Sequence, residues 1–193
     1  MTARVPGWAL LSSAAAPVLL IGGWTVAASR QPADFNSVRD TISALAGHAA
    51  TDRWIMTAGL AGLGVCHMVT ALGLRQARRP SRLIHALGGA ATVLVAAFPL
   101  PADGGSAAHT TVASVALGSL ALWPAFAWRP DAQPVALRPG PALTATAVML
   151  GLVIWFGATL GSDTSGLVER CAAGAQALWP LAVVLTARRT RSR

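Results

Sequence analysis

Six apolar runs, each about 20 residues long, set the strongest constraint on how this chain can fold. They cover residues 8–29, 54–74, 83–100, 109–128, 141–160 and 168–187, and clusters of Arg, Pro or Gly separate them. A helix needs about 20 apolar residues to cross a bilayer, where its backbone polar groups must pair within the segment. No loop is long enough to hold a folded domain of its own. The pattern therefore predicts an all-α, polytopic membrane protein, in which residues 1–193 form a single bundle of six transmembrane helices.

Composition and charge support a membrane location. Hydrophobic residues make up 54% of the chain and charged residues only 11%, against about 25% charged in an average soluble domain. All fifteen basic residues are Arg, and this Arg-only, Ala-rich usage is typical of a high-GC bacterium.

The Arg distribution predicts the topology. If both termini are cytoplasmic, four Arg fall on the outer side: Arg30, Arg39, Arg53 and Arg170. The other eleven, which include Arg4, Arg191 and Arg193, fall on the inner side, as the positive-inside bias requires. We therefore predict a multi-pass protein of the bacterial cytoplasmic membrane with its N- and C-termini inside. Because the basic tail serves topology and contact with anionic lipids, we expect no nucleic-acid partner.

The stretch "DFNSVRDTISALAGHAATDRW", residues 34–54, is the longest polar segment between apolar runs. Its apolar residues recur at the spacing of an amphipathic helix: Phe35, Val38, Ile42 and Leu45. Ser37 and Asp40 form a pair similar to a capping box. We therefore predict a short amphipathic helix over about residues 38–46, on the outer face, as part of a structured lid over residues 35–53. Thr51 or Asp52 is expected to cap the second span.

Polar side chains at the level of this lid form the candidate site. An Arg guanidinium matches a phosphate or carboxylate in shape and charge. We predict a non-enzymatic protein that binds or organises membrane lipids in an outward-facing polar pocket, where Arg39, Arg53 and His109 contact a headgroup. The full set of predicted ligand-binding residues is Arg39, Asp40, Ser43, Asp52, Arg53, His109, Glu169 and Arg170. We expect no metal and no cofactor.

Several alternatives stay open at this point. The lid charges can be merely solvated, and Glu169 can serve as an acid in the first turn of its helix. A membrane hydrolase or transferase would use Asp40 and His109 with a metal or water. An accessory subunit would use its helices to contact a larger membrane complex.

Histidines are the ionisable groups closest to the middle of the predicted spans. His67 is a functional candidate by its depth alone, although a neutral His can also bond a neighbouring helix. Counting from the predicted span ends places His67 and His85 at depths that differ by about 7 Å, which argues against a bis-histidine haem. No Asp or Glu lies in the middle of any span, so we expect no acidic relay of the kind that ion-coupled transporters use.

Small residues within the spans predict close helix approach. The candidates are Gly59, Gly62, Gly64, Gly88, Gly89, Gly151 and Gly157.

The segment "VRDTISALAGHAATDRWIMTAGLAGLGVCHMVTALGLR", residues 38–75, resembles a bacterial six-helix membrane family named domain of unknown function 998. "FPLP" at residues 98–101, His109 after it and "LWP" at residues 122–124 strengthen the resemblance, which extends over about residues 6–187. The motif positions in this chain are Arg39, Ile42, Ser43, Leu45, Asp52, Arg53, Trp54, Pro99, His109 and Pro124. The resemblance implies a helical bundle and a distant alliance with FRAG/DRAM/Sfk-type proteins, which are associated with lipid handling. It implies no defined activity.

Overall fold

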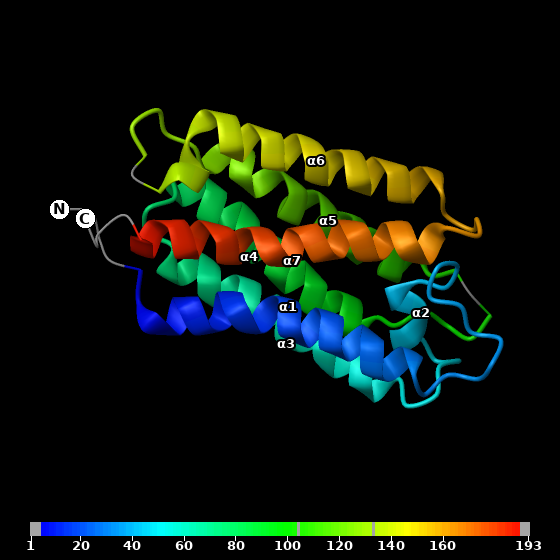
Figure 1. Ribbon diagram of the computed structural model, residues 1–193. Coiled ribbons are helices and arrows are strands. Elements are labelled where there is room, and N and C mark those ends of the chain that lie inside the picture. Colours follow the sequence, from blue (N-terminus) through cyan, green and yellow to red (C-terminus); the bar gives the residue numbers. More distant parts are fainter. Residues whose placement is uncertain (1–4, 104, 133, 190–193) are drawn as a thin grey trace.

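The computed structural model describes residues 5–103, 105–132 and 134–189 (Figure 1). Within these residues the protein is all-α, with seven α-helices and one short 3-10 helix, η1 (Val135–Leu137). Arg4, Arg191 and Arg193, which entered the topology prediction, lie outside the described residues.

Six long helices form the body of the molecule. They are α1 (Gly7–Ala28), α3 (Trp54–Gly73), α4 (Arg79–Ala97), α5 (Ala107–Ala127), α6 (Pro139–Ala158) and α7 (Ser165–Arg189). Each contacts the next along the chain, and α7 also returns to α1, so successive helices run antiparallel in a closed bundle (Figure 1). Every predicted span coincides with one of these helices to within four residues at each end.

Five of these helices, α1 and α3 to α6, are long and apolar enough to cross a membrane. The prediction of a multi-pass helical membrane protein is therefore confirmed. Helix α7 is the longest, at 25 residues, but it is not among the five. It carries Glu169, Arg170, Arg188 and Arg189, which lower its mean hydropathy.

The start of α4 lies four residues before the predicted start of the third span. The predicted boundary treated Arg79 and Pro80 as part of a loop, whereas both belong to the first turn of the helix. Pro is tolerated there because the N–H that it lacks would have no partner within the helix. The helix ends at Ala97, since Pro99 disfavours a helical conformation at Phe98, whose φ is −115° and ψ 70°.

Helices α3 and α4 touch backbone to backbone at Gly64 and Gly89. A Cβ atom added to Gly64 would lie 2.5 Å from the carbonyl oxygen of Gly89, and one added to Gly89 would lie 2.6 Å from the carbonyl oxygen of Gly64. This contact confirms the predicted close approach in these two spans. The same prediction is wrong for Gly151 and Gly157, which face open space because α6 lies at the rim of the bundle and buries few residues.

Two apolar clusters fill the interior. One lies toward the end of the bundle that holds α2 (Ile42–Ala46) and includes Leu20, Leu45, Met56 and Leu60. The other lies toward the end where α3 connects to α4 and includes Leu74, Trp123, Leu137 and Val184. We refer to these two ends as the cap end and the hairpin end. The buried histidines of α3 and α4 lie between the two clusters along each helix.

Residues 29–53, the cap segment, cross the cap end between α1 and α3 (Figure 1). A helix is present there but is shorter than predicted, because α2 begins at Ile42 and Thr41 is its N-cap, accepting from the Ala44 N–H at 3.1 Å. The predicted Ser37–Asp40 capping pair is therefore wrong. Residues 36–40 instead form a turn in which the Asp40 carboxylate accepts from the Asn36 N–H at 2.7 Å.

The apolar stripe of this segment is only partly buried. Ile42 and Leu45 point into the core, Phe35 packs partly against it, and Val38 is exposed. The predicted cap of α3 by Thr51 or Asp52 is also wrong, because Arg53 holds the N-cap position and no side chain caps the helix. Asp52 instead adopts a left-handed conformation with φ 50° and is exposed.

Candidate functional site

The buried carboxylate of Glu169 anchors the cap segment to α7. One oxygen, Oε2, accepts from the backbone N–H of Ile42, and the other, Oε1, accepts from the Ser43 hydroxyl at 3.2 Å. These donors belong to the first turn of α2, where N–H groups have no partner within the helix. The predicted site residues Ser43 and Glu169 are thus in direct contact, although 126 residues separate them in sequence.

Arg170, the next residue, fixes the same segment through its backbone. Its Nη1 donates to the carbonyl oxygens of Ser37 at 2.7 Å and Asp40 at 2.8 Å, and its guanidinium lies 5.9 Å from the ring centroid of Trp24. Backbone N–H groups at the start of α7 add two bonds, to the carbonyl oxygens of residues 38 and 39. Because Arg170 is bound in this way, it does not neutralise Glu169 by a direct ion pair.

Arg39 and Asp40 pair with each other on the exposed surface of the cap segment. Arg39 donates from Nε to Asp40 Oδ1 at 2.9 Å and from Nη2 to Oδ2 at 3.0 Å. This hydrogen-bonded guanidinium holds the pKa of the Asp40 carboxyl below its usual value. The pair lies in the turn that precedes α2, so it stiffens the cap segment.

The remaining predicted residues do not join this group. His109 is buried, and its Nδ1 donates to the carbonyl oxygen of Phe98 at 2.8 Å. Within the described part of the chain, the Arg53 side chain bonds only the Ala46 carbonyl oxygen, at 3.5 Å. Asp52 is exposed. Arg39, Arg53 and His109 thus each have a local partner, and no contact joins the three among the described residues.

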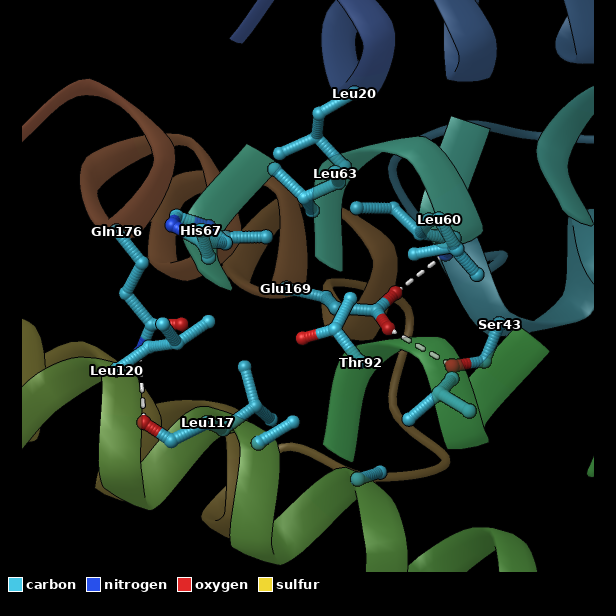
Figure 2. Close-up of a pocket in the computed structure, with 15 residues that line it drawn as sticks. Leu20, Ser43, Leu60, Leu63, His67, Thr92, Leu117, Leu120, Glu169 and Gln176 are labelled. Carbon is cyan, nitrogen blue, oxygen red and sulfur yellow. Dashed lines mark hydrogen bonds between the residues drawn. The ribbon is translucent and has the colours of Figure 1, made fainter. Parts of the chain in front are cut away.

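A cavity of about 60 Å³ lies beneath the cap segment, inside the bundle. Figure 2 shows Ser43 and His67 on opposite sides of this cavity, with Glu169 and Thr92 between them. Most of the wall is apolar, with Leu20, Leu60, Leu63, Leu117 and Leu120 as its largest members. Five polar side chains line it: Ser43, His67, Thr92, Glu169 and Gln176.

The polar lining residues differ in how their own hydrogen bonds are used. Thr92 donates to the carbonyl oxygen of Gly88 at 2.8 Å, and Gln176 donates to that of Leu117 at 2.9 Å. His67 Nε2, in contrast, is buried without a hydrogen-bond partner among the described residues. The cavity therefore combines an apolar wall, a buried acid and an unused imidazole nitrogen.

A pair of histidines continues from the cavity toward the hairpin end. His67 Nδ1 and His85 Nε2 lie 3.0 Å apart, and the His85 ring stacks on Trp123 with centroids 4.6 Å apart and planes at 10°. The predicted difference in depth between the two histidines is wrong, because each lies six residues from the hairpin end of its helix. The early start of α4 accounts for this correction.

Sequence reasoning missed Thr92, Gln176 and the His67–His85 contact. Thr92 and Gln176 are single polar residues in apolar runs, and their polarity was the only available signal. Among the described residues, no three His, Cys, Asp or Glu side chains lie close enough together to hold a metal ion. Glu169 is the one acid that lines the cavity among the described residues.

The family model described as "Protein of unknown function (DUF998)" matches residues 13–186. The chain therefore belongs to this family, as the motifs around the cap segment indicated. No curated protein and no solved structure matches the chain. The distant likeness to FRAG/DRAM/Sfk-type proteins stays a prediction.

Proposed function

We propose that this member of the DUF998 family binds a membrane lipid beneath the cap segment, with the polar part of the headgroup at Ser43 and Glu169. The observation that carries the proposal is the buried Glu169 carboxylate at the wall of a mostly apolar cavity. Apolar pockets with a few convergent polar groups are the usual form of a small-ligand site. Lipids are the most abundant amphipathic molecules around a membrane protein. A lipid therefore suits both the mostly apolar wall of the cavity and the membrane location of the protein.

The carboxylate favours a particular headgroup chemistry. An ionised carboxylate only accepts hydrogen bonds, so it suits a hydroxyl or amine and repels a bare phosphate. Ser43 can donate or accept beside it. We therefore propose a headgroup that presents a hydroxyl or an amine to Glu169. The anionic headgroup contact by Arg39, Arg53 and His109 stays a separate prediction, which the same binding experiment tests.

The cap segment acts in this proposal as a lid. A cavity of about 60 Å³ is too small for a complete lipid, so the headgroup has to displace α2 as it enters. The Glu169 bonds to Ile42 and Ser43 would then be exchanged for bonds to the ligand. Such an exchange keeps the acid satisfied in both states, which lowers the free-energy difference between them.

We also propose α7 as a sixth transmembrane helix, with both chain ends in the cytoplasm. It packs between α1 and α6 within the bundle (Figure 1). Its polar residues Glu169 and Gln176 face the interior cavity, where polar groups of membrane helices are tolerated. The remaining charged residues of α7 lie near its two ends: Arg170 is bound to the cap segment, and Arg188 and Arg189 lie in the last turn. The Arg distribution supports this orientation in a bacterial cytoplasmic membrane.

Native mass spectrometry of the purified protein, released from detergent with its bound lipids, tests the proposal. We expect the wild type to retain one lipid class and Glu169→Gln to lose most of it, because the amide offers one acceptor atom in place of two. Asp163→Asn is the matched control, since it makes the same chemical change on an exposed loop residue. We expect it to retain lipid as the wild type does.

Two other outcomes redirect the proposal. If Arg39→Ala/Arg53→Ala loses the lipid while Glu169→Gln retains it, the ligand site is the predicted outer headgroup site and the cavity site is wrong. If neither the wild type nor any variant retains a selective lipid, lipid binding is wrong and the accessory-subunit alternative takes its place. The hydrolase alternative has no support from geometry, because Asp40 and His109 are bonded to different partners.

A further inference from the structure

Three buried polar atoms on α3 and α4 have no hydrogen-bond partner among the described residues and lie in sequence along the bundle. His67 Nε2, His85 Nδ1 and Ser81 Oγ are all buried and have no hydrogen-bond partner among the described residues. A buried polar atom left unpaired costs about 1–3 kcal/mol, so three of them on adjoining helices need an explanation. Packing of α3 on α4 accounts for the bond between the two rings but leaves these three atoms unused.

The three atoms follow one another in depth. Ser81 and His85 are four residues apart on α4, so they lie on one face about 6 Å apart along the axis. His85 is bonded to His67, and His67 lines the cavity that also exposes Glu169. Together these groups extend from Glu169, in the second turn of α7, to Ser81, in the first turn of α4.

The cavity spans the distance between Glu169 and His67, which is the longest step between neighbouring groups of this line. Glu169 and Gln176 both line it and are seven residues apart, which is about 10 Å along α7. A water molecule needs about 10–15 Å³ of such space and two to four polar partners. The volume of about 60 Å³ and the polar groups Thr92, Glu169 and His67 meet both conditions for a short file of water molecules.

We propose that Glu169, the cavity, His67, His85 and Ser81 form a proton path between the cap end and the hairpin end of the bundle. The path uses neutral histidines and needs no acid in the middle of a span. It shares Glu169 and the cavity with the proposed lipid site, whereas His85 and Ser81 do not line the cavity and belong to the path alone.

Each proton transfer along the path is balanced. The Glu169 carboxylate takes up a proton at the cap end, and this O–H bond breaks as the proton moves to a cavity water. That water passes a proton to His67 Nε2, where an N–H bond forms, and Glu169 is again a carboxylate. The N–H bond at His67 Nδ1 breaks as its proton moves to His85 Nε2. His85 then releases its Nδ1 proton to the Ser81 oxygen as the Ser81 O–H proton leaves toward the hairpin end, so the hydroxyl stays neutral. One proton has entered and one has left, both rings are again neutral in the other tautomer, and rotation of the two rings restores the starting state.

The charged and titratable surroundings leave this path unblocked. Helices α1 and α6 carry no titratable side chain. On α3 the neighbour is Cys66, and on α4 the Arg82 side chain is bound to the carbonyl oxygens of Ala71 and Leu72. On α5 His109 lies at the cap end, bound to Phe98, and on α7 Arg170 is bound to the cap segment. No cation thus sits beside the histidine pair among the described residues.

Proton flux in vesicles of phosphatidylcholine with a minority of phosphatidylglycerol tests the path. The full chain is reconstituted, a potassium diffusion potential is imposed with valinomycin, and a trapped dye reports internal pH. We expect wild-type vesicles to change pH faster than protein-free vesicles. We expect Glu169→Gln, His85→Gln and Ser81→Ala to return the rate to that of protein-free vesicles. His48→Gln, on the exposed part of the cap segment, is the matched control and should keep the wild-type rate.

Three results decide the matter. Wild-type vesicles that change pH no faster than protein-free vesicles overturn the path whatever the variants do. A wild-type rate of proton flux in the folded Ser81→Ala and Glu169→Gln variants also overturns the path. Because Ser81→Ala removes only a hydroxyl, this test can still be made if His85→Gln fails to fold. Lost flux in Ser81→Ala with lipid retention unchanged supports the path and separates it from the lipid site, whose own failure would appear only in the mass spectrum.

Discussion

Substituting Ala for Gly64 forces α3 and α4 apart at their closest contact. The new Cβ would lie 2.5 Å from the Gly89 carbonyl oxygen, 2.7 Å from Val93 Cγ2 and 2.8 Å from the Val93 backbone N. An ordinary contact between carbon and oxygen is about 3.3 Å or longer, so the two backbones have to separate by about 0.8 Å. Two of the three neighbouring atoms belong to the backbone and cannot rotate away.

The expected size of the effect follows from a matched control in α6. Gly151→Ala adds the same methyl group into open space, so it gains the helical preference of Ala, about 1 kcal/mol, without a clash. Gly64→Ala gains that preference too but also carries the overpacking penalty, about 1–3 kcal/mol. The difference between the two variants isolates the contact and should equal that penalty.

Thermal unfolding of both variants in the same detergent measures this difference. For chains of 150–250 residues, 1 kcal/mol corresponds to about 2–4 °C in Tm, so Gly64→Ala should unfold at least a few degrees below Gly151→Ala. Equal Tm values would refute the packing of α3 on α4 described above. They would also remove the basis for placing His67 beside His85.

Three further predictions concern the cap segment and the lipid-facing surface. Glu169→Ala leaves the Ile42 N–H and the Ser43 hydroxyl without acceptors, so the docking of α2 weakens by about 1–3 kcal/mol for each buried donor. Amide hydrogen exchange over residues 42–46 should therefore be faster than in the wild type, and unchanged exchange would contradict the weaker docking. Arg39 lowers the pKa of Asp40 in the folded protein below its ordinary 3.8. The stabilisation from this pair is therefore complete above pH 3.8 and is lost only as the pH falls through the lower pKa of the folded state. An NMR titration that finds a pKa of 3.8 or above for Asp40 would rule out the pair. Val148 is 54% exposed at the middle of α6, so Val148→Asp should impair membrane insertion by about 3–4 kcal/mol in a glycosylation-mapping assay. Normal insertion would mean that this face does not meet lipid.

The spans could be predicted from the sequence because bilayer thickness fixes the length of an apolar helix. The ends of the spans could be predicted less precisely, since they depend on the residues at each helix terminus. Pro80 illustrates this, because Pro separates helices in one context and starts them in another. The four residues that it added to α4 changed the depth of His85 and with it the most informative contact in the interior.

Several residues of the candidate site could be predicted from the sequence, but the contacts between them could not. Ser43 and Glu169 were predicted as site residues and are in direct contact, and the predicted Arg170 bonds the carbonyl oxygen of Asp40. Their pairing depends on how α7 packs against the cap segment, which no local pattern encodes. Arg39, Arg53 and His109 each bond a nearby carboxylate or carbonyl oxygen, and their contact with a headgroup stays a prediction.

The most direct test of the central claim, that the cavity under Glu169 holds the ligand, is the amount of lipid retained by Ala113→Leu. Ala113 lines the cavity, so this change adds three carbon atoms to the cavity and leaves the side chains of Ser43 and Glu169 unchanged. Native mass spectrometry should show that Ala113→Leu loses the lipid class that the wild type retains, while Ala158→Leu, at the end of α6 and exposed, keeps it. Full retention of that lipid in folded Ala113→Leu would contradict the account, because the ligand would then lie outside the cavity.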